Sequence, residues 1–296
     1  MVLGIRTLVL GAALLACATP ALAQTRETQR ATDGGDIVVT GRLDPPTLTT
    51  EIRRFVRGHA RLSRIDQIAR WREPICVNVI NLPEAYGSFI ANRIAAVARE
   101  AGAPAQDRAG CTPNVSIVFT TEPQALINSI RAENPQMLGY HALGERDAVA
   151  TMTRPIQAWH VTATSNGHVT ALDEPMRDPP SGMAGSRLTN RLSSVFVHAL
   201  IVVNQSEVAD APIGPIADYL AMMALTDIRD ERWGCGGLVT ILELFSQECP
   251  SAPQELTISD RAFLQGLYSM DEEAIASLQR GRIAGVLQDA LGDGEP

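Results

Sequence analysis

Residues 75–82 read ICVNVINL and residues 115–120 read VSIVFT, two short apolar runs that are rich in β-branched side chains and typical of buried strands. The segment between them, residues 83–101, has helical apolar spacing and ends before Gly102 and Pro104, which favour the end of a helix. Residues 122–133 show the same spacing, with Thr121 as the predicted cap. This βαβα order predicts two neighbouring parallel strands joined by a right-handed crossover. Four side chains of the first helix are predicted to face the core: Phe89, Ile90, Ile94 and Val97.

Further strands and helices are predicted downstream of this unit. Residues 156–164 and 168–172 flank Ser165-Asn166-Gly167, a strong turn signal, and therefore predict a β-hairpin. Residues 193–204 (SSVFVHALIVVN) predict a long strand, and residues 216–228 predict an apolar helix. The rest of the chain is predicted to be helical, at residues 238–245, from a cap at Thr257 or Ser259 to residue 268, and at residues 271–291.

Upstream of the βαβα unit, the apolar spacing predicts a helix from a cap at Thr49 or Thr50, across a break at Gly58, to Trp71. Several arginines of this segment form a basic face, which we interpret as a solvated face paired with nearby acidic residues. Taken together, the pattern predicts an α/β (α+β) fold: a βαβα unit, a hairpin and a long strand, followed by helices. Residues 48–296 are predicted to form a single α/β domain with a helical C-terminal part.

The composition of the 296-residue chain is that of a globular protein, with 45% hydrophobic and 20% charged residues. Its formal net charge is −8 at pH 7. General nucleic-acid binding depends on basic side chains that neutralise phosphates, so this acidic balance argues against a nucleic-acid partner.

The first 23 residues have the features of a signal peptide. Arg6 supplies the positive charge, residues 7–17 form the apolar region, and Ala21-Leu22-Ala23 is a cleavage signal before Gln24. We therefore expect a periplasmic or otherwise exported protein. The alternative is an outer-membrane lipoprotein, because Leu14-Leu15-Ala16-Cys17 resembles a lipobox and Cys17 would then carry the lipid anchor. No second apolar stretch approaches the length of a membrane span, so none is expected in the mature chain.

Four cysteines remain if Cys17 leaves with the signal peptide, an even number that favours disulfides in an oxidising compartment. Four cysteines allow three pairings. We favour the pairs that are nearest in sequence, Cys76–Cys111 and Cys235–Cys249. The sequence contains no CxxC or CxxH motif around these cysteines. We therefore expect neither a metal site nor a cofactor.

Residues 24–47 are polar and predict a flexible leader, interrupted by the β-type run Ile37-Val38-Val39-Thr40. This run resembles the IVVTGR segment near the mature N-terminus of TonB-dependent outer-membrane receptors. The resemblance implies a docking strand for a periplasmic protein partner, which would pair with it through main-chain hydrogen bonds. The chain is too short to hold the plug and barrel of such receptors. The other interpretation, an edge strand of the chain's own domain, stays open.

The order of elements from residue 71 to about residue 291 resembles that of zincin-like (metzincin-like) peptidase domains. In that family, the helix after the last strand carries HExxH, whose two histidines bind zinc. The corresponding positions here read Ala217-Asp218-Tyr219-Leu220-Ala221. Alanine cannot coordinate a metal, so the resemblance implies a degenerate zincin-like fold without its zinc.

Three residues are candidates for a catalytic site. Asp218 lies in an apolar helix, where burial would perturb a carboxyl group unless an arginine such as Arg229 pairs with it. His160 and His198 lie in predicted strands, and a site that also includes His168 is conceivable, although a strand histidine is more often a core residue. The chain contains no GxSxG, SxxK or CxxC motif.

The sequence therefore leaves two functions open. The first, which we prefer, is a non-catalytic exported cell-envelope protein that acts by binding another protein or a cell-wall component. The second is a periplasmic, peptidase-like hydrolase with an atypical carboxylate/histidine site made of Asp218, His160 and His198.

Overall fold

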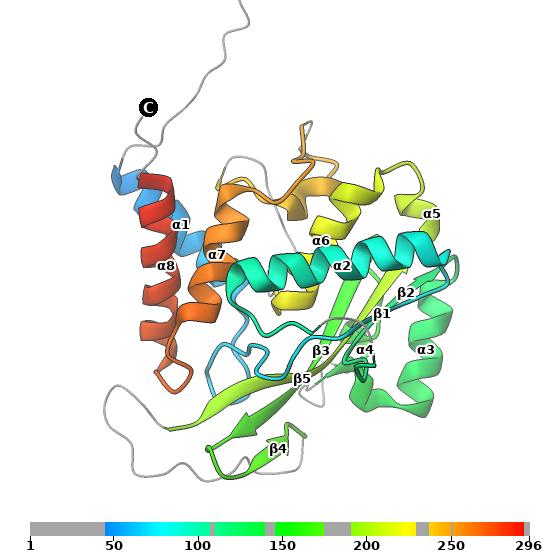
Figure 1. Ribbon diagram of the computed structural model, residues 1–296, viewed down its shortest axis with the longest axis horizontal. Coiled ribbons are helices and arrows are strands. Elements are labelled where there is room, and N and C mark those ends of the chain that lie inside the picture. Colours follow the sequence, from blue (N-terminus) through cyan, green and yellow to red (C-terminus); the bar gives the residue numbers. More distant parts are fainter. Residues whose placement is uncertain are drawn as a thin grey trace, which may run out of the picture. The chain divides into compact units, whose positions relative to one another are not determined.

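The centre of the protein is a five-stranded mixed sheet with the strand order β1-β2-β5-β3-β4 (Figure 1). The computed structural model describes residues 45–106, 110–139, 146–174, 191–228, 237–249 and 251–292. The predicted signal peptide, the docking strand at residues 37–40, Cys17 and Cys235 lie outside these residues.

Three strands of the sheet are parallel, two of them the neighbouring pair that the βαβα pattern predicts. β1 (Val77–Ile80) pairs with β2 (Val115–Thr120), and β2 pairs with β5 (Ser193–Asn204). β3 (Ile156–Ser165) runs antiparallel to both β5 and β4 (Thr170–Leu172). The fold is therefore mixed α/β, and both the predicted hairpin and the long strand are confirmed.

The turn of the β3–β4 hairpin forms because of two residues. The Asn166 side-chain oxygen accepts hydrogen bonds from the backbone N–H groups of His168 and Val169, at 3.0 and 2.8 Å. Gly167 has a φ of 85°, a left-handed conformation that costs glycine little. The short polar side chain and the glycine together explain why Ser165-Asn166-Gly167 is a turn.

Helices cover the two faces of the sheet unequally. The main core lies on one face and involves α1 (Pro45–His59), α2 (Glu84–Ala101), α6 (Ile213–Leu225), the 3-10 helix η2 (Ile241–Phe245), α7 (Ile258–Ser269) and α8 (Ala276–Gly292). A smaller core on the other face involves α3 (Pro123–Glu133), the 3-10 helix η1 (Pro135–Leu138) and α4 (Arg146–Val149). The short α5 (Gln205–Val208) follows β5. α7 and α8 pack side by side at one end of the sheet (Figure 1).

The predicted helix at residues 49–71 is wrong in its second half. α1 begins at Pro45 and ends at His59, and residues 60–74 are not helical. Arg70 lies alongside β5 instead: its N–H donates to the Ser194 carbonyl, and its own carbonyl accepts from the Phe196 N–H. This pairing with the sheet overrides the helical spacing of the apolar residues.

Several smaller predictions also need correction. Phe89 is 45% exposed, because the buried side of α2 is formed by Ile90, Ile94 and their neighbours and Phe89 projects away from it. Thr121 is not the cap of α3, which starts at Pro123 after Glu122. The apolar helix α6 begins at Ile213 and ends at Leu225, three residues earlier than predicted at each end.

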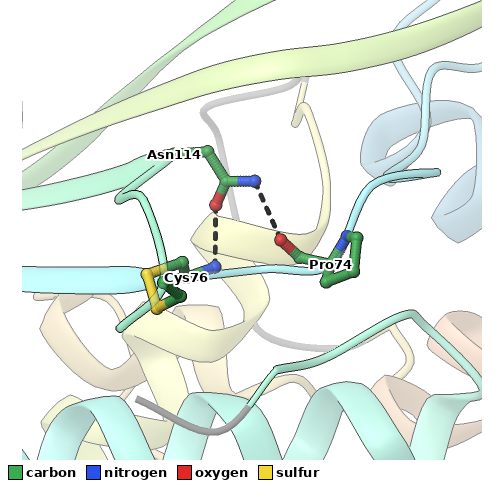
Figure 2. Close-up of a disulfide and its surroundings, with 4 residues drawn as sticks. Pro74, Cys76 and Asn114 are labelled. Carbon is green, nitrogen blue, oxygen red and sulfur yellow. Dashed lines mark hydrogen bonds between the residues drawn. A yellow bond between two sulfur atoms is a disulfide. The ribbon is translucent and has the colours of Figure 1, made fainter. Parts of the chain in front are cut away.

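The Cys76–Cys111 disulfide is confirmed and joins the beginnings of two strands. Asn114 also links the beginnings of these two strands (Figure 2). Its side-chain oxygen accepts a hydrogen bond from the Cys76 N–H at 2.8 Å, and its side-chain amide donates to the Pro74 carbonyl at 3.1 Å. Cys249 is also disulfide-bonded, and its predicted partner, Cys235, lies outside the described residues. Within the described ranges, no helix is long and apolar enough to cross a membrane.

Candidate functional site

Asp218 is held between two other elements of the main core. It is 3% exposed, and both of its carboxylate oxygens accept hydrogen bonds from Arg93 of α2, with Nη2 to Oδ2 at 3.1 Å. Oδ2 also accepts from the Leu256 N–H at 3.0 Å, just before α7. The arginine that pairs with Asp218 is therefore distant in sequence. These hydrogen bonds occupy the carboxylate oxygens that a catalytic role for Asp218 would need.

The alanines beside Asp218 give no support to a zincin-like site. Ala217 and Ala221 are 0% exposed and belong to the main core, as does every residue of α6 from Ile216 to Leu225 except Asp218 itself. The positions that align with metal ligands therefore lie inside packed aliphatic side chains. The zincin resemblance stays a prediction about the element order alone.

His160 lies inside the core beside the C-terminal end of α6. Its ring packs against Phe196, with ring centroids 4.6 Å apart, and its Nδ1 is 4.0 Å from an Asp227 carboxylate oxygen. Neither ring nitrogen makes a hydrogen bond within the described residues. Burial lowers the pKa of His160, and the negative charge of Asp227 opposes that effect. This environment is that of a neutral core histidine.

His198 lies in β5 next to β2. Its Nε2 is 3.3 Å from the Ser116 Oγ, and its Nδ1 has no hydrogen-bond partner in the part of the chain that the structure describes. Burial lowers the pKa of His198, and the nearby His160 lowers it further. Ser116 is a residue that sequence reasoning did not select, because no motif surrounds it.

The two histidines belong to opposite faces of the sheet. In the β3–β5 register, His160 pairs with Ala199, a residue of the main core. His198 is two residues from Leu200 on the same strand, so it shares the face of Leu200, which belongs to the second core. His168 is exposed in the hairpin turn. The sheet therefore separates His160 from His198, and the described residues contain no group of three or more potential metal ligands.

An exposed aromatic pair lies on the outer side of α2. Tyr86 is 52% exposed and Phe89 is 45% exposed, in a chain with only 4% aromatic residues. Their i, i+3 spacing places them on one helical face, which continues to Arg93 four residues later. The Arg93 side chain is itself 32% exposed while it binds Asp218. Exposed aromatic side chains next to an arginine are typical of contact surfaces.

The outer edge of β1 is a second exposed feature. β1 is the terminal strand of the sheet, and beyond it only a short bridge, Ile75 with Ala105, is found among the described residues. A groove of about 40 Å³ lies between this strand and α2. It is lined by Ile75, Val77, Ala91, Asn92, Ala95, Arg99, Gln106 and Cys111.

Comparisons with known proteins give no relatives for this chain. No protein-family model, no curated protein and no solved structure matches it.

Proposed function

We propose that this chain is a non-catalytic exported cell-envelope protein that acts by binding another protein or a cell-wall component. The observation that carries this proposal is the exposed pair Tyr86 and Phe89 on α2. A large aromatic side chain that stays exposed to water contributes little to the stability of the fold. At interfaces, however, aromatic residues supply much of the free energy of binding.

The geometry of the polar candidates supports binding over catalysis. Asp218 is engaged by Arg93 and by the Leu256 N–H, and His160 and His198 belong to opposite faces of the sheet. The separation of the two histidines and the engagement of the carboxylate favour binding over catalysis by these three side chains. The disulfide between Cys76 and Cys111 supports an oxidising compartment, which is compatible with export. The leader run at residues 37–40 would supply a second contact, with a periplasmic partner.

A photo-crosslinking amino acid at position 89 tests the proposal in intact cells. We expect discrete adducts from position 89 and none from position 278. Leu278 is the matched control, because it is as exposed as Phe89, at 44%, but lies on a different helix, α8. In a separate pull-down without the crosslinker, Phe89→Ser should recover less of the partner identified from the adducts. The melting temperature of this variant should be unchanged. Identical adduct patterns at positions 89 and 278 would contradict a specific contact surface.

The hydrolase alternative has one observation in its favour, the approach of the Ser116 Oγ to the His198 Nε2. A serine bonded to a histidine is the arrangement of an activated nucleophile, although no third group among the described residues orients the Nδ1. Hydrolysis of peptide or ester substrates that is lost in both Ser116→Ala and His198→Ala would favour this alternative over binding.

A further inference from the structure

We draw no further inference here: the strongest candidate, the carboxyl edge of β1 and β2 where α2 and α3 begin without a side-chain cap, rests on two helix N-termini alone, because no buried side chain that lacks a hydrogen-bond partner among the described residues lies at that edge.

Discussion

Arg93 on α2 and Asp218 on α6 are separated by 125 residues in the chain and form a two-point salt bridge. The carboxylate also accepts the Leu256 N–H, so one buried side chain fastens α2, α6 and the segment before α7 together. Arg93 keeps 32% of its side chain exposed, which limits the desolvation cost of the pair.

Asp218→Ala should therefore destabilise the protein by about 2 to 3 kcal/mol, because it leaves the Leu256 N–H buried without its acceptor and removes the partner of Arg93. The measurement is urea unfolding at pH 7. Asp289→Ala, at an exposed position of α8, is the control and should change the free energy of unfolding by less than about 0.5 kcal/mol. If the two variants unfold alike, the bridge has no structural role.

The sequence predicts features that depend on local signals, but not contacts such as Arg93 with Asp218 between residues far apart in the chain. The βαβα order was predictable because short β-branched runs and a glycine-terminated helix are local signals. Phe89 was misplaced because helical spacing alone does not say which side of α2 meets the sheet. Residues 60–71 are not helical as the apolar spacing predicts, because Arg70 pairs with β5, a contact of high sequence separation that the spacing does not reveal. A partner for Asp218 at position 93 has no local signal at all.

Gly266 on α7 packs directly against Ile283 on α8. A Cβ at position 266 would lie 2.8 Å from the Ile283 Cα, too close to the backbone of a neighbouring helix. Gly266→Ala should therefore destabilise the protein by about 1 to 3 kcal/mol, even though alanine is the better helix former. Circular dichroism melting should show a lower melting temperature.

Gly285→Ala on α8 is the matched control for this substitution, because nothing lies within 4 Å of the added methyl group. It should stabilise the protein by about 0.5 to 1 kcal/mol through helix propensity alone. A stabilising effect at both positions would show that α7 and α8 can separate without cost.

The Cys76–Cys111 disulfide closes a segment with a sequence separation of 35. The double variant Cys76→Ser and Cys111→Ser should lower the free energy of unfolding by about 3 to 4 kcal/mol, chiefly because the unfolded chain regains conformational freedom. Urea unfolding without reductant checks this value, since the disulfide of Cys249 then stays intact. A loss below about 1 kcal/mol would contradict this expectation.

The two strand histidines, His160 and His198, make stability depend on pH in a defined direction. Burial lowers the pKa of His160 and of His198 below the value of about 6.5 that they have when unfolded. The unfolded state therefore takes up protons first as the pH falls, so the stability contributed by each neutral histidine is complete above about pH 6.5 and is lost below it. The loss is at most about 1.4 kcal/mol per pH unit for each histidine.

Urea unfolding at pH 7.5 and pH 5.5 measures this effect, and His160→Phe isolates the contribution of one ring. Burial raises the pKa of Glu243 and Asp260, and these carboxyl groups act in the opposite direction in both proteins, so they cancel in the comparison. We expect the wild type to lose more stability on acidification than His160→Phe does. An equal loss would mean that Asp227, 4.0 Å from the Nδ1, stabilises the protonated ring as well as water does in the unfolded chain.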